Sequence, residues 1–166
     1  MSLYTNLLDA LSPENKVFVA FSGGLDSTAL LFLCNKALKQ KKIRNLKAIH
    51  INHNLSENSD YWEQHCERFC KSNNIEFKSF IIEVTKNRSS IESQARQERY
   101  KIFESLLDEN DQILLAHHRD DVFETILLRL FRGTGVDGLS GLNEKRSLGK
   151  GAVSYTHLRA HETAVN

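Results

Sequence analysis

The sequence has little proline, little cysteine and no long hydrophobic run. Its 166 residues include one proline and three cysteines. No apolar run approaches the roughly 20 residues that a membrane-spanning helix needs, and the N-terminus shows no signal-peptide pattern. An odd number of cysteines without metal-site spacing argues against a disulfide-stabilised extracellular domain. These absences predict a cytoplasmic protein without a membrane segment.

An excess of charge of one sign is also absent. The 22 basic and 21 acidic residues leave a formal net charge of +1, so any surface that binds nucleic acid must be local. Hydrophobic residues make up 40% and charged residues 26%, which is typical of a globular domain. A chain of this length is expected to form one domain with a substantial core.

Strand and helix patterns alternate along most of the chain. β-branched and aromatic apolar segments predict strands at 16–21, 46–51, 76–82 and 112–116. Helical periodicity predicts helices at 26–38, 62–70, 91–107 and 122–131. The first of these helices is apolar on nearly all sides, and the second has an apolar face of Trp62, Cys66, Phe69 and Cys70. The alternation predicts an α/β fold, a parallel sheet with helices on both faces.

Polar residues follow three of the predicted strands. They are SGGLDS after the first strand, NHN after the second and HHRDD after the fourth. Ligands of parallel α/β sheets bind beyond the carboxyl ends of the strands. We therefore expect these three segments to form one ligand site.

The SGGLDS segment has the composition of an anion-binding loop. Gly23 and Gly24 permit positive φ and close approach of a ligand, and Asp26 and Ser27 lie where the next helix begins. A carboxylate beside phosphate is compatible with binding when Mg²⁺ bridges them. The segment lacks the lysine of a Walker loop and the spacing of a dinucleotide fingerprint. The alternative is a plain strand-to-helix turn capped by Ser22 or Asp26.

The motif S-G-G-x-D-S after a buried strand resembles the pyrophosphate (PP) loop of the N-type ATP pyrophosphatases. These enzymes cleave ATP between its α- and β-phosphates and release pyrophosphate. Three further segments, 49–70, 91–100 and 114–142, resemble the tRNA(Ile)-lysidine synthetase family within that superfamily. The resemblance covers about residues 15–150 and implies a Rossmann-like fold of the adenine nucleotide alpha hydrolase type.

The resemblance also implies an activity. Members of the family are ATP-dependent ligases that join L-lysine to C2 of the wobble cytidine of tRNA(Ile) through an adenylated cytidine, releasing AMP and pyrophosphate. The expected cofactors are ATP and Mg²⁺, and the expected partners are tRNA(Ile) and L-lysine, with a homodimer left open. Two alternatives stay open: another PP-loop enzyme, such as a tRNA thiolase or an amide-forming synthetase, and a non-catalytic nucleotide-binding domain.

By this resemblance the loop residues hold the pyrophosphate of ATP: Ser22, Gly23, Gly24, Leu25, Asp26 and Ser27. Asp26 is in addition a candidate catalytic residue and a candidate Mg²⁺ ligand. The backbone at 49–52 is expected to contact adenine, and His53 is interpreted as structural.

A second group of candidate catalytic residues begins the fourth predicted helix. It consists of His117, Asp120, Asp121 and Glu124. Asp121 and Glu124 are i, i+3 neighbours on one helix face. This number of polar groups exceeds what stabilisation of a helix N-terminus needs, so we expect metal coordination or contacts with cytidine and lysine. Asp121 is the second candidate metal ligand, and the spacing leaves the other roles open.

Arg96 and Arg99 lie one helical turn apart, which ordinarily indicates a solvated basic face. The resemblance makes Arg96 a candidate catalytic residue that contacts phosphate or RNA. Cys66 and Cys70, spaced C-x-x-x-C, are interpreted as core residues. Further basic candidates for holding tRNA are Arg129, Arg132, Lys145, Arg146 and Lys150.

The last part of the chain breaks the pattern. Residues 133–142 are rich in glycine, residues 143–151 are expected to be basic and flexible, and residues 152–166 show no clear period. We expect a catalytic domain at 1–150 followed by an uncertain, non-native or disordered tail at 151–166. Because members of the resembled family are longer, the chain is expected to be a truncated catalytic domain.

Overall fold

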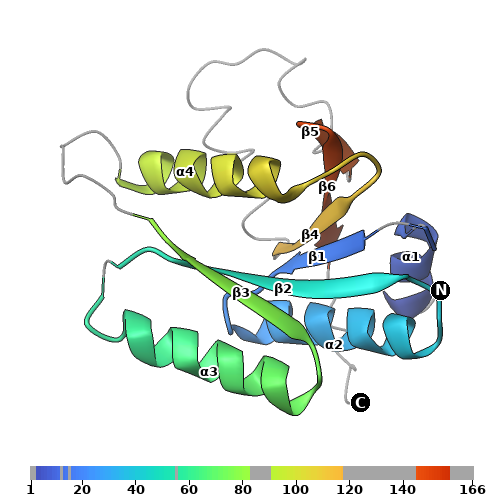
Figure 1. The fold of residues 1–166 in the computed structure, drawn as a ribbon, viewed down its shortest axis with the longest axis horizontal. Coiled ribbons are helices and arrows are strands. Elements are labelled where there is room, and N and C mark those ends of the chain that lie inside the picture. The colour runs from blue at the N-terminus through green and yellow to red at the C-terminus, as the bar shows by residue number, and fades with distance from the viewer. Residues whose placement is uncertain are drawn as a thin grey trace, which may run out of the picture.

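The computed structural model describes residues 3–11, 13–14, 16–54, 56–82, 91–117 and 145–157. Six strands form one sheet, and helices lie on both of its faces (Figure 1). The elements in chain order are α1 (Leu3–Ala10), β1 (Lys16–Ala20), α2 (Leu25–Lys39), β2 (Asn45–Asn52), α3 (Ser59–Ser72), β3 (Glu76–Ile81), α4 (Ile91–Leu106), β4 (Gln112–His117), β5 (Lys145–Leu148) and β6 (Gly151–His157).

The strand order is β3-β2-β1-β4-β6-β5. Every adjacent pair is parallel except β5 and β6, which are antiparallel. Strands β2 and β3 lie on one side of β1. The chain then passes through α4 to β4, which lies on the other side of β1. The strand order therefore reverses between β1 and β4, which is where α/β sheets of this kind bind ligands. The predicted fold class is confirmed.

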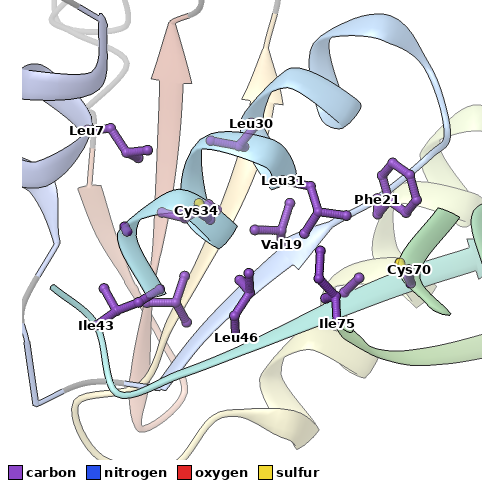
Figure 2. Close-up of a cluster of buried hydrophobic side chains, with 14 of the residues drawn as sticks. Leu7, Val19, Phe21, Leu30, Leu31, Cys34, Ile43, Leu46, Cys70 and Ile75 are labelled. Carbon is purple, nitrogen blue, oxygen red and sulfur yellow. The ribbon is translucent and has the colours of Figure 1, made fainter. Parts of the chain in front are cut away.

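The central strand β1 is buried on both faces because its side chains alternate. Val17 and Val19 face α1, α2 and α3, while Phe18 packs with Phe103 and Leu107 near α4. Figure 1 shows α2 and α3 on one side of the sheet and α4 on the other. The larger core cluster, on the side of α2 and α3, is drawn in Figure 2 and includes Leu7, Leu30, Leu31, Cys34, Leu46, Cys70 and Ile75.

Helix α2 differs in one respect from its sequence pattern. Its bounds agree with the predicted helix, and Leu30, Leu31 and Cys34 are fully buried against the sheet. Leu25 and Phe32, however, are 86% and 60% exposed. The nearly all-round apolar pattern therefore does not give all-round burial, because α2 lies in an outer layer and only one of its faces meets the sheet.

The end of the described chain also differs from expectation. Residues 145–148 form β5, and residues 151–157, which we assigned to the tail, form β6 between β4 and β5. Gly149 has φ +56 in the short turn between them, a conformation that favours glycine. Val153 is fully buried beside Phe103, and Gln112 Nε2 donates a 2.6 Å hydrogen bond to Ser154 Oγ. The sheet therefore continues past the expected boundary at 150.

Some sequence predictions fall outside the described residues. These include the helix at 122–131, the glycine-rich segment at 133–142 and the remainder of the tail at 158–166. Helix α1 was not among the predicted elements. No helix in the described part of the chain combines the length and apolar character needed to cross a bilayer.

Candidate functional site

The SGGLDS loop joins the end of β1 to the start of α2. Gly23 has φ +84, so the loop uses a backbone conformation that a residue with a side chain rarely adopts. The hydroxyls of Ser22 and Ser27 lie 3.0 Å apart, and Ser27 Oγ donates a 3.0 Å hydrogen bond to the Gly24 carbonyl. These contacts close the loop on itself and fix both hydroxyls at its centre.

The N-terminus of α2 carries no side-chain cap. Gly24 is the N-cap residue, and its own N–H donates a 3.3 Å hydrogen bond to Ser22 Oγ. No side chain among the described residues caps the N–H groups of the first helical turn that follow. In the alternative interpretation, a plain turn, the capping of the helix by Ser22 or Asp26 is therefore not seen. The N–H groups of the first helical turn are left for an anion, which the helix dipole also favours. The side chain of Leu25 is 86% exposed and carries no hydrogen-bond donor, so this residue can bind an anion only through its backbone N–H.

A cleft of about 540 Å³ lies beside this loop. Its walls come from the loop, the end of β2 and the start of α3, and the residues lining it are Ser22, Gly24, His50, Ile51, Asn52, His53, Ser56, Ser59 and Trp62. Two of the three polar segments predicted to meet therefore do so. Trp62 was predicted in the core, but it is 48% exposed and lines the cleft. It lies in the first turn of α3, where the helix extends past the core.

Hydrogen bonds hold the end of β2 in place. His50 is 6% exposed, and its Nδ1–H donates to the Phe21 carbonyl at 2.8 Å. Because a carbonyl only accepts, this bond fixes the tautomer. Asn52 Nδ2 donates to Glu63 Oε2 at 2.8 Å, and Asn52 Oδ1 accepts from the Asn54 N–H at 2.9 Å. The wall of the cleft is thus connected both to the loop and to α3.

A smaller cavity of about 150 Å³ adjoins the same loop from the side of α4. Its polar residues are Ser22, Ser27, His53 and Arg99, and its apolar residues include Ile49, Phe103 and Leu115. His53 lines both cavities. Its buried Nδ1 has no hydrogen-bond partner among the described residues. Burial, followed by the charges of Arg99 and His50, lowers the pKa of His53 below its ordinary 6.5, which favours a neutral imidazole.

The two arginines of α4 are placed differently. The guanidinium carbons of Arg96 and Arg99 lie 5.4 Å and 5.9 Å from the centre of the Tyr100 ring. Arg99 lines the smaller cavity, whereas Arg96 is exposed and lines neither cavity. The residue nearer the loop is therefore Arg99, which the sequence pattern did not separate from Arg96.

His117 is the last residue of β4. Because Ala20 pairs with Leu115, His117 lies beyond the end of β1, at the same sheet edge as the loop. The His117 side chain and Asp120, Asp121 and Glu124 lie outside the described residues. Their predicted roles stay predictions, as does a metal at Asp26 and Asp121. The described residues alone contain no group of three or more His, Cys, Asp or Glu side chains suited to a metal.

The basic candidates for holding tRNA are described only in part. Arg129 and Arg132 lie outside the described residues, and Lys145 and Arg146 belong to β5. Lys150 lies in the turn before β6. Since β6 begins beside Gln112, the first residue of β4, this turn is at the sheet edge opposite the loop.

All three cysteines of the chain are free and buried. Burial raises the pKa of Cys66 to about 11 and those of Cys34 and Cys70 to about 12. Cys66 and Cys70 belong to the larger core cluster, which confirms the core interpretation.

Residues 2–157 match the model of a family described as the PP-loop domain, so the chain belongs to the PP-loop domain family. Among curated proteins it is similar to tRNA(Ile)-lysidine synthase of Legionella pneumophila (strain Lens), with 45% identity over 156 residues that cover 89% of this chain and 36% of the relative. The enzyme of the same name from Pseudomonas syringae pv. tomato is 43% identical over 155 residues, covering 92% and 35%. The chain thus spans about a third of the length of these relatives.

Among solved structures the chain resembles the U34-tRNA thiolase NcsA from Methanococcus maripaludis with its [4Fe-4S] cluster. The TM-score is 0.66 at 24% sequence identity, and the match covers 91% of this chain and 56% of the thiolase chain. This likeness supports the fold alone.

Proposed function

We propose that this domain binds ATP and catalyses ATP-dependent ligation of lysine to C2 of the wobble cytidine of tRNA(Ile). The observation that carries the proposal is the uncapped N-terminus of α2, which adjoins two serine hydroxyls and a cleft of about 540 Å³. That volume is within the usual range for a small-molecule site. The similarity to tRNA(Ile)-lysidine synthases supports the choice of substrates.

In this proposal the loop binds the phosphates of ATP and the cleft binds its adenine. Ser22, Ser27 and the backbone of Gly23, Gly24 and Leu25 hold the pyrophosphate, because N–H groups and hydroxyls donate hydrogen bonds to anions. Adenine occupies the cleft beside β2, against the backbone at 49–52. The α-phosphate is then left accessible to the O2 atom of cytidine, whose attack forms the adenylated cytidine and releases pyrophosphate.

The residues of the loop fit a Mg²⁺ ion. Asp26 supplies one carboxylate in the first turn of α2, and the serine hydroxyls are further oxygen donors. Mg²⁺ is commonly held by one or two carboxylates together with substrate phosphates. When bound, the ion neutralises charge on the phosphates. Asp121 is the proposed second carboxylate.

The second step needs a neutral lysine amine, which attacks C2 and displaces AMP. We assign contacts with lysine and cytidine to His117, Asp120, Asp121 and Glu124, and a phosphate or RNA contact to Arg96. His53 and Arg99 join this set because they line the cavity on the α4 side of the loop. A cytoplasmic location completes the proposal and rests on cysteine usage, and a homodimer stays open.

A thiolase-type reaction has less support in this chain. Sulfur transfer and iron–sulfur ligation both use cysteine thiolates. Here each thiol is buried and has a raised pKa, so the thiolate is disfavoured. A nucleotide sensor without turnover is the other alternative, and it would bind ATP without forming AMP.

The test is incubation of the protein with Mg–ATP, labelled lysine and a tRNA(Ile) transcript. Lysine-dependent AMP and labelled tRNA are expected. Asp26→Asn should lower the rate by about 10²–10³, since it removes one electrostatic group at the reacting phosphates. Asp60→Asn is the matched control, because Asp60 is also in a first helical turn, that of α3. AMP formation driven by sulfide or ammonia in place of lysine would contradict the proposal.

A further inference from the structure

The loop rests on helix α3 at Gly23. A Cβ atom built on Gly23 would lie 2.8 Å from Cys66 Sγ, 3.7 Å from His65 Cδ2 and 3.9 Å from Trp62 Cε3. The first distance is shorter than real Cβ contacts allow. The backbone of Gly23 therefore packs directly against the thiol of Cys66, and the side chains of His65 and Trp62 lie beside it.

Cys66 itself has no room to move away. Its exposed fraction is 0%, and it belongs to the core cluster that also contains Cys70 and Val19. Protein interiors are close-packed, so a change in volume at such a position is transmitted to its neighbours. The neighbour on the loop side is Gly23.

Two other contacts hold α3 against the same region. The rings of Phe21 and Phe69 lie 5.5 Å apart between centroids, which joins the residue before Ser22 to α3. The hydrogen bond from Asn52 to Glu63 joins α3 to the end of β2. Helix α3 is thus fixed beside both strands that border the site, and it also contacts Gly23 in the loop between β1 and α2.

We propose that Cys66 is a positioning residue for the phosphate-binding loop, acting through the size of its side chain rather than through thiol chemistry. The inference rests on the proposed function in so far as the loop binds the phosphates of ATP. A side chain of the right volume at position 66 keeps Gly23 and the adjoining backbone N–H groups aligned with the N-terminus of α2. The buried thiol, whose pKa is raised to about 11, is protonated in this role.

The experiment compares valine and serine substitutions at two cysteines of α3. Cys66→Val adds volume beneath Gly23, whereas Cys70→Val makes the same change at a residue that is equally buried but is not among the near neighbours of Gly23. Cys66→Ser keeps one γ atom, slightly smaller than sulfur, and removes the thiol. The dissociation constant of Mg–ATP, the thermal midpoint, and the amide resonances of Ser22 and Gly23 without ligand are measured for each variant.

We expect both valine variants to lower the thermal midpoint, and Cys66→Val alone to weaken Mg–ATP binding at least tenfold and to shift the loop resonances. Cys66→Ser should bind Mg–ATP within about threefold of the unaltered protein, a difference of about 0.7 kcal/mol by the affinity relation. If Cys66→Val does not fold, Cys66→Ala replaces it in the experiment. This variant removes the Sγ atom that contacts Gly23, which should weaken Mg–ATP binding several-fold.

Equal weakening of Mg–ATP binding by Cys70→Val would overturn the inference. An unchanged dissociation constant in folded Cys66→Val, or in the Cys66→Ala variant that replaces it, would also overturn it. Failure of the unaltered protein to bind Mg–ATP would instead refute the proposed function. The loop resonances then decide the positioning role by themselves, because they are measured without ATP.

Discussion

Replacement of Gly23 by alanine tests the loop geometry most directly. The substitution places a side chain on a residue with φ +84, which costs an L-residue about 1–2 kcal/mol. It also places the new Cβ 2.8 Å from Cys66 Sγ, and crowding of a well-packed core costs about 1–3 kcal/mol. The sum, roughly 2–5 kcal/mol, is a large part of the 5–15 kcal/mol typical of a domain.

The assay is urea unfolding of the protein followed by circular dichroism, with the free energy of unfolding obtained by linear extrapolation. Gly24→Ala is the matched control. Gly24 has φ −73, and a Cβ there would meet only Ser22 Oγ at an ordinary 3.5 Å. Its cost should stay within about 1 kcal/mol, the range for exchange of an N-cap glycine.

A double-mutant cycle separates the two contributions. In a Cys66→Ala background the crowding is relieved, so Gly23→Ala should cost only the conformational part, about 1–2 kcal/mol. The reasoning is refuted if Gly23→Ala leaves the free energy of unfolding unchanged. It is also refuted if its cost is the same with and without the sulfur at position 66.

Two further predictions concern the walls of the cleft. Asn52→Ala removes the hydrogen bond to the Glu63 carboxylate and should lower the free energy of unfolding by about 1.5–3 kcal/mol in urea titrations; a change below about 0.5 kcal/mol would contradict the assigned contact. Because the pKa of His53 is lowered in the folded protein, the unfolded chain takes up a proton near pH 6.5, before the folded chain does. The contribution of His53 to the free energy of unfolding is therefore complete above that pH. It is lost as the pH falls through the folded-state pKa. His53→Gln should therefore lose less thermal stability than the unaltered protein between about pH 7.5 and about pH 5.5, and an identical loss in both would show that His53 does not titrate in this way.

Much of the fold was predictable because its signals are local. The predicted strands at 16–21, 46–51, 76–82 and 112–116 agree with β1 to β4 within one or two residues. The composition of the SGGLDS segment likewise predicted its position between β1 and α2. Alternation of strand and helix then restricts the sheet to parallel arrangements with right-handed crossovers, so the carboxyl ends of the strands meet at one edge.

The errors arose where a residue's environment depends on distant parts of the chain. Trp62 continues the apolar face of Cys66 and Cys70. Periodicity shows which side of a helix is apolar, but it does not show how far along the helix that side is packed against the sheet. Residues 151–157 lack a strong period of their own and become a strand by pairing with β4 on one side and β5 on the other. Pairing over such a separation leaves no local signal.

The sequence by itself determined the order of the elements from β1 to β4, the composition of the SGGLDS loop and the sheet edge at which this loop meets the NHN segment, because these follow from short-range periodicity and turn chemistry. Only the tertiary structure decided that Arg99 rather than Arg96 lines a cavity, that Trp62 borders the cleft and that Gly23 is seated on Cys66. The physical reason is close packing. Gly23 and Cys66 come together because the chain runs from the loop after β1 through α2 and β2 into α3. The elements packed around these two residues fix the space between them.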